Sequence, residues 1–350
     1  MVSVKEKSGV VLLAFITPLL PGCLATYLVK SSYEHVKILN ARQEIQSVMQ
    51  ENKVAPAKKQ KLQLALDARQ FAEKNLGLTP TDNYTTYVDL DRPYVTWVLR
   101  AAPAYELKPH TWWYPIVGSM PYRGFYSEQE AHDAAKEFPK EKYDTYVRGV
   151  SAYSTLGWFD DPILSSMLRY RDHDLVNVII HETVHATIFI KGHANFNESL
   201  ATFLGNKGTE LYYLEREGPN SKTVKVIRDE NHDDQLFSQF IGHELKQLQA
   251  WYENTPELTI KSEKENRIQQ IKDRFKNELQ PKLLSQKYDQ FTSRPLNNAN
   301  LLSYKTYFHD LSDFEKLAIE FDGDFKKLIA ACKKLEGTGD PAKELKNWIE

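Results

Sequence analysis

The pattern of apolar and polar positions singles out residues 175–190, which are apolar on nearly every side. A segment of this kind indicates a helix buried in the protein interior. The run stops at Lys191 and Gly192, and a glycine can take the left-handed conformation that closes many helices. The pattern therefore predicts a buried helix that ends at these two residues.

Polar side chains inside that helix need partners, because each costs roughly 2–7 kcal/mol if it is buried alone. The segment contains His181, Glu182 and His185, which together form the pattern His-Glu-x-x-His. Positions i and i+4 share one helix face, so His181 and His185 can hold one metal ion between them. Glu182 lies about 100° round the helix, where it can reach a water held by that metal without being a ligand.

A catalytic zinc site needs a third protein ligand and an open fourth position, whereas a structural site is closed by a fourth ligand, often cysteine. The nearest candidate for the third ligand is Glu198, which begins the next predicted helix after a short loop. Two helices joined by so short a loop pack together, which brings Glu198 opposite the two histidines. The alternative is a chance occurrence of the motif, which the buried setting disfavours.

The remaining elements follow from the period of the apolar positions. Helices are predicted at residues 25–52, 57–76, 127–137, 232–253, 257–288, 301–309, 311–321 and 325–335, and strands at 84–90, 94–102, 112–125 and 144–153. Ser127 and Glu130 have the spacing of a capping box, and Pro281 is expected to kink or break its helix.

These elements predict an α+β fold that is predominantly helical, with a small β-sheet before the metal helix. We expect an N-terminal helical hairpin at residues 23–80, packed on a catalytic domain at 81–350. Within that domain, residues 84–153 are rich in strands and residues 173–350 are helical.

The N-terminus has the features of a secretory signal, with lysines followed by a short apolar run. It ends in Leu-Pro-Gly-Cys, which resembles a bacterial lipobox and predicts a signal peptide at 1–22 with lipidation at Cys23. The alternative is an uncleaved anchor helix at about 9–29, which Pro18 and Pro21 disfavour. Both readings tether the protein to a membrane. For the lipoprotein we expect the periplasmic face of a bacterial cell envelope, with the outer membrane preferred.

The composition excludes some classes of function but does not identify one. The 350 residues carry 45 basic and 47 acidic side chains, interspersed along the chain, so there is no electrostatic footprint for nucleic acid. The two cysteines, Cys23 and Cys332, provide neither a disulfide framework nor a cysteine-based zinc site. We expect a monomer.

Several segments together resemble the bacterial putative aminopeptidase family of His-Glu-x-x-His lipoproteins, which follow the logic of thermolysin-like gluzincins. The segments are 91–95, 121–125, 152–159, 181–185, 196–199 and 297–299, with Tyr307 downstream. The resemblance implies a gluzincin arrangement in which His181, His185 and Glu198 bind Zn²⁺ and Glu182 is the general base. It further implies a peptide substrate.

A peptidase also needs a group that stabilises the oxyanion. Tyr307, Tyr153 and Arg123 are the candidates, in that order, because each lies in one of the family-like segments. Two other classes of function stay open: an envelope scaffold that binds zinc, in which Glu182 would be dispensable, and a zinc hydrolase that acts on amide bonds other than those of peptides. An intact Glu182 favours an enzyme.

Overall fold

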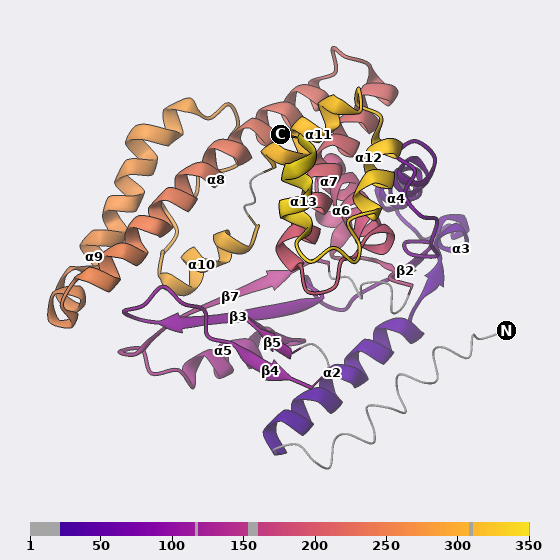
Figure 1. Ribbon diagram of the computed structural model, residues 1–350. Coiled ribbons are helices and arrows are strands. Elements are labelled where there is room, and N and C mark those ends of the chain that lie inside the picture. The colour runs from indigo at the N-terminus through magenta and orange to yellow at the C-terminus, as the bar shows by residue number, and fades with distance from the viewer. Residues whose placement is uncertain (1–21, 116–117, 153–159, 308–310, 350) are drawn as a thin grey trace.

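The computed structural model describes residues 22–115, 118–152, 160–307 and 311–349, and for residues 22–25 and 305–307 it describes the backbone only. Most of the described residues lie in helices, and the strands form small sheets (Figure 1). The predicted class, α+β and predominantly helical, is therefore confirmed. The gluzincin-like fold and the division into domains stay predictions.

The α-helices contain most of the described residues. They are α2 (Gly22–Asn40), α3 (Ile45–Gln50), α4 (Pro56–Lys74), α5 (Glu128–Lys136), α6 (Asp172–Thr187), α7 (Ala194–Glu217), α8 (Lys222–Asn254), α9 (Glu257–Arg274), α10 (Asn298–Tyr307), α11 (Ser312–Glu320), α12 (Phe325–Lys333) and α13 (Pro341–Ile349). Among the described residues, no helix is both long enough and apolar enough to cross a membrane.

The strands form three small sheets. They are β1 (Gln43–Glu44), β2 (Thr86–Val88), β3 (Thr96–Pro103), β4 (Trp112–Tyr114), β5 (Gly118–Met120), β6 (Arg123–Phe125), β7 (Tyr143–Val150) and β8 (Ile163–Leu164). The central sheet has the order β6-β3-β7 and is antiparallel. A second sheet, β1-β2-β8, pairs β2 with β8 in parallel, and β4 and β5 form a hairpin.

The buried apolar side chains of the described residues form two hydrophobic cores. The larger core contains α6, which packs between α4 and α7, together with residues from the C-terminal helices. The smaller core lies between α8, α9 and α10 and the end of β3. In Figure 1, α8 and α9 extend to one side of the helices around α6, and the sheet of β3 and β7 lies below both groups.

The predicted helix at 25–52 is wrong in its length, because the chain breaks after Asn40 and resumes as α3. The two residues of β1 lie in the break and pair with β2 in antiparallel register. The side chain of Arg42 donates to the carbonyl of Leu39 and closes the end of α2. Pairing with a strand distant in sequence outweighs a helical pattern here.

Two further local predictions need correction. The prediction of one strand at 112–125 is wrong, because β4 turns back on β5 and only β6 joins the central sheet. Ser127 does precede α5, yet its side chain makes no capping hydrogen bond, so the capping box is not formed. The break expected near Pro281 is confirmed. The α-helix α9 ends at Arg274, and it is followed by a π turn and then by a 3₁₀ turn that contains Pro281.

Asn298 connects the central sheet to helices α8 and α9 through hydrogen bonds. Its side chain is completely buried and donates to the carbonyls of Pro103 and Ala104, at 3.0 and 3.1 Å. The same side chain accepts a 2.9 Å hydrogen bond from the hydroxyl of Tyr252 on α8. Its backbone N–H donates to Asp144 of β7, which also binds Lys264 of α9. One residue therefore links strands and helices from distant parts of the chain.

Asn298→Ala is expected to lower the free energy of unfolding by about 2–4 kcal/mol, because it leaves buried carbonyls and a buried hydroxyl without partners. Urea denaturation measures the change. Asn266→Ala is the matched control, since Asn266 is exposed and its side chain donates to the nearby Glu263, and we expect it to change stability little. Equal losses in the two variants would contradict the role assigned to Asn298.

Candidate metal centre

Helix α6 carries the His-Glu-x-x-His motif and forms as its apolar pattern predicts. Leu175, Val176, Ile179, Ile180 and Val184 are fully buried. The acidic residues of its first turn, Asp172 and Asp174, suit the positive end of the helix dipole. The motif therefore lies in the last turns of a helix whose other faces are held by the core.

The end of α6 differs from the prediction. The helix stops at Thr187 and not at Gly192, and Ile188 already has extended backbone angles. Ile188 and Ile190 are buried whereas Phe189 between them is exposed, an alternation typical of extended chain. Gly192 does adopt a positive φ of 87°, but it does so within the loop that follows.

The side chain of Asn197 fixes the loop from α6 to α7 through hydrogen bonds. The sequence analysis assigned this residue no role. Its side chain is buried and pairs with both backbone groups of Ile190, accepting from the N–H and donating to the carbonyl at 2.9 Å each. Because Asn197 immediately precedes Glu198, this pair of hydrogen bonds fixes the helix turn that carries the expected third ligand.

Glycines on α7 let the two helices approach closely. A Cβ on Gly205 would lie 3.4 Å from the Cβ of His181 on α6, and a Cβ on Gly208 would lie 3.2 Å from the side chain of Ile180 on α6 and 2.7 Å from that of Leu76. A side chain at Gly208 would therefore force its neighbours apart. The close approach of α7 to α6 is what allows the short carboxylate of Glu198 to reach the histidines.

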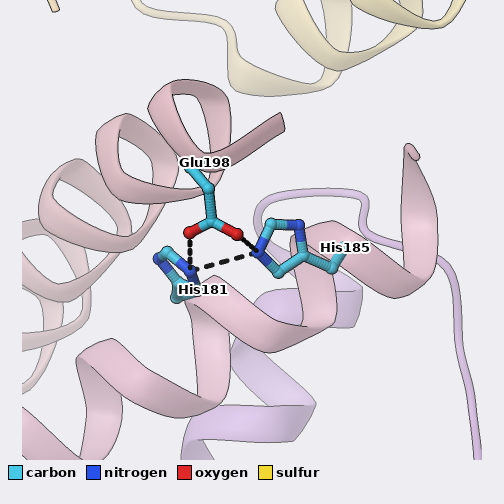
Figure 2. Close-up of side chains that lie close together, drawn as sticks. All are labelled: His181, His185 and Glu198. Carbon is cyan, nitrogen blue, oxygen red and sulfur yellow. Dashed lines mark hydrogen bonds and ion pairs between the residues drawn. The ribbon is translucent and has the colours of Figure 1, made fainter. Parts of the chain in front are cut away.

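The structure brings His181, His185 and Glu198 together, as Figure 2 shows. The Nε2 atoms of the two histidines lie 3.2 Å apart. Each faces a different oxygen of the Glu198 carboxylate, at 3.6 Å for His181 and 3.4 Å for His185. His185 is almost fully buried whereas the Glu198 side chain is 42% exposed, so the group is reached from solvent on the Glu198 side.

The electrostatics of the group favour a charged carboxylate. Burial raises the pKa of Glu198, but the neighbouring imidazoles of His181 and His185 outweigh it and hold that pKa far below its ordinary value. The carboxylate is therefore ionised across the physiological range. The Nδ1 atom of His185 is buried and has no hydrogen-bond partner among the described residues.

The spacing of these atoms fits a tetrahedral metal ion. Ligand atoms about 2.0–2.1 Å from zinc, at tetrahedral angles, lie about 3.3–3.4 Å from one another. The three separations between His181, His185 and Glu198 are 3.2, 3.4 and 3.6 Å. Without a cation, the two Nε2 atoms can satisfy each other with at most one proton. The donor set and the spacing together fit a metal with one open position.

Glu182 lies beside this group on α6, and its charge acts on Tyr84, a residue to which the sequence analysis assigned no role. Tyr84 is buried, with 2% of its surface exposed. Burial raises the pKa of Tyr84 well above its ordinary value, and the charges of Glu182 and Asp161 raise it further. Tyr84 precedes strand β2, and no sequence signal marks it as part of a site.

Of the predicted oxyanion and lipidation residues, only Arg123 has a described side chain, and it is not among the residues that converge on the metal group. Arg123 lies on β6, where its guanidinium is 4.2 Å from the centre of the Tyr27 ring. Tyr153 lies outside the described residues. Tyr307 is the last residue of α10 and Cys23 is the second residue of α2, and of both only the backbone is described.

A second group of three possible metal ligands also lies close together, but a neighbouring arginine already neutralises its negative charge. His173, Asp174 and Glu230 lie close together where α6 begins and α8 passes. Arg171 binds both oxygens of Glu230, at 2.5 and 2.9 Å, and both oxygens of Asp174, at 2.6 and 3.0 Å. A guanidinium in this position repels a cation, so we interpret the cluster as a structural ion pair.

This ion pair predicts a loss of stability in acid. Burial raises the pKa of Glu230, but hydrogen bonds from His173 and Arg171 outweigh it and lower the pKa to about 2. A depressed pKa in the folded state stabilises the protein above the ordinary value of 4.5. This contribution is lost as the pH falls from about 4.5 to about 2.

Glu230→Gln is therefore expected to lower the free energy of unfolding by about 1–3 kcal/mol at pH 7, allowing for partial solvent exposure of Arg171. The difference from wild type should shrink as the pH falls from 4.5 to 2. Thermal unfolding across that range measures it. Glu257→Gln, at an exposed pair with Lys261, is the control and should change little. A difference that stays constant with pH would contradict the assignment.

Comparison with protein families matches the chain to a family whose description names a peptidase. A family model described as "Putative aminopeptidase" matches residues 26–347, from α2 to α13. The match covers nearly the whole chain, so this protein belongs to that family, in agreement with the resemblance seen in its sequence segments. Comparisons with curated proteins and with solved structures found no match.

Proposed function

We propose that the protein is a membrane-anchored zinc peptidase, and that it acts as an aminopeptidase as its family description suggests. The observation that carries the proposal is the convergence of His181, His185 and Glu198 on one point, with Glu182 adjacent on the same helix. Three protein ligands and an open fourth position are typical of catalytic zinc and not of structural zinc.

The donor set narrows the choice of metal. Two imidazole nitrogens and one carboxylate suit Zn²⁺, and the same set also occurs in non-haem iron enzymes. The glutamate between the histidines favours zinc, because a base beside the metal serves hydrolysis. His181, His185 and Glu198 would hold the ion, which supplies a Lewis acid that polarises water and the substrate carbonyl.

Glu182 moves the proton in this mechanism. It accepts a proton from the attacking water as the new C–O bond forms at the peptide carbonyl. When the C–N bond breaks, Glu182 delivers that proton to the departing amine. The group is partly exposed to solvent at Glu198, and a peptide would approach from this side.

The membrane anchor is a proposal from sequence. Cys23 stands at the start of α2, and the family match begins just after it, at residue 26. A lipid on Cys23 would therefore attach in the first turn of α2. We place the protein in a bacterial cell envelope on this basis, lipid-anchored on the periplasmic face.

The experiment has two parts, both on the protein purified without chelators. Elemental analysis should find about one zinc and no comparable amount of iron per chain. A screen of peptides with free and acetylated N-termini should then show cleavage, and preference for a free N-terminus identifies an aminopeptidase.

The outcomes separate the rival functions. Protein without zinc contradicts the peptidase proposal. Zinc without hydrolysis of any peptide or amide supports a zinc-binding scaffold, and cleavage of other amides alone supports a non-peptidase zinc hydrolase.

A further inference from the structure

Phe189 exposes a large apolar side chain to solvent directly beyond the metal helix. Its side chain is 43% exposed, whereas Ile188 and Ile190 on either side of it are buried. Single apolar side chains on a protein surface are common and need no function. Phe189 differs from these because the chain holds it in a fixed orientation, next to a residue of the metal group.

Hydrogen bonds on both sides of Phe189 fix the backbone. The N–H of Ile188 donates to the carbonyl of Val184, in the last turn of α6, at 2.8 Å. Both backbone groups of Ile190 pair with the buried side chain of Asn197, at 2.9 Å each. Successive side chains of an extended chain point to opposite sides. Because Ile188 and Ile190 belong to the larger core, Phe189 must point away from it.

The Phe189 ring contacts the metal group through His185. The two ring centres are 6.5 Å apart and the ring planes meet at 75°, an edge-to-face arrangement. The same imidazole faces the partly exposed carboxylate of Glu198 at 3.4 Å, as Figure 2 shows. The buried His185 therefore contacts two side chains that both reach solvent. A substrate that reaches the metal group comes within reach of Phe189.

The distance suits a substrate side chain close to the bond that is cleaved. An extended peptide advances about 3.3–3.6 Å per residue, so about two residues span the separation between His185 and Phe189. A large apolar side chain that covers the exposed part of the Phe189 ring removes apolar surface of both partners from water. A small polar side chain gains little from the same contact.

We propose that Phe189 is a specificity-determining residue, and that its ring contacts a large apolar side chain beside the scissile bond. The preferred substrates are then peptides with a residue such as leucine or phenylalanine at that position. The inference rests on the proposed function, because it names the substrate class of the same site. The contact forms when the peptide binds and persists during the reaction, so it acts on KM and not on kcat.

The experiment uses peptides in which leucine or serine is placed independently on either side of the scissile bond. We expect the wild type to prefer leucine at one of these two positions. Phe189→Ala should raise KM for the preferred peptide about 5- to 30-fold, leave kcat within about twofold and remove the preference. Phe189→Leu should retain most of the preference, because leucine also offers an apolar surface.

Leu258→Ala is the matched control. Leu258 is an apolar side chain that is 81% exposed on α9, a helix that extends away from α6 in Figure 1. This change should alter neither KM nor the preference. Zinc content and melting temperature are measured for every variant, and we expect those of Phe189→Ala to match the wild type.

A second measurement reads the contact without turnover. In protein that carries Glu182→Gln, calorimetry gives the dissociation constant of the leucine peptide, which Phe189→Ala should raise by the same 5- to 30-fold. Cleavage without a preference for leucine, or a preference that survives Phe189→Ala, overturns the inference and leaves the peptidase proposal intact. Weaker zinc binding with an unchanged preference shows that Phe189 only shields His185. A wild type that neither cleaves nor binds any peptide overturns the proposed function, and this inference with it.

Discussion

Glu182→Gln is expected to lower kcat for peptide hydrolysis by about 10²- to 10⁴-fold, the range of general acid–base catalysis. Glutamine has nearly the same shape but cannot accept the proton of the attacking water. Because Glu182 is not one of the three converging residues, the variant should keep its full zinc content. A loss of rate without a loss of metal is the result that identifies a base.

The measurement compares kcat, KM and zinc content with those of the wild type. Glu210→Gln is a suitable control, since Glu210 is a largely buried carboxylate on α7 that pairs with Arg228 at 2.6 Å. We expect this change to leave kcat and zinc content unaltered. If Glu182→Gln lost its zinc as well, Glu182 would be part of the metal site. If it kept its full rate, the base would be another group.

The metal group itself was predictable from sequence because its geometry is local. The i and i+4 spacing places His181 and His185 on one face of any helix. The short loop to α7 constrains the partner helix to pack alongside, which brings Glu198 within reach. These predictions need no knowledge of distant contacts, and the structure brings the three side chains together.

Contacts between distant segments limited the other predictions. Residues 41–44 look helical, but pairing with β2 converts part of them into strand. Ile188 and Ile190 continue the apolar run of α6, yet both backbone groups of Ile190 bind Asn197. In each case the partner that decides the structure is absent from the local pattern.

The backbone of Tyr84 shows the same limit. Its positive φ depends on Asp161, which lies far along the chain. By contrast α13, which is absent from the predicted helices, carries a readable signal. Asp340 precedes Pro341, and the Asp340 side chain accepts a hydrogen bond from the N–H of Lys343. Aspartate at the cap with proline at the first position is a common helix start.

Glu198→Ala is expected to abolish stoichiometric zinc binding, and activity with it. The carboxylate contributes one of three donors and the only negative charge among them. Removing a residue that only hydrogen-bonds a metal ligand weakens metal affinity about 10- to 100-fold. Removing a ligand itself should therefore weaken the affinity by more. Glu215→Ala is the matched control, because Glu215 is on the same helix but binds the side chain of Asn75.

Zinc competition with a chelator at fixed pH measures both variants. A Glu198→Ala protein that kept wild-type affinity would show that the two histidines recruit another ligand. The affinity of the wild type should fall in acid, because His181 and His185 bind zinc only in their neutral form.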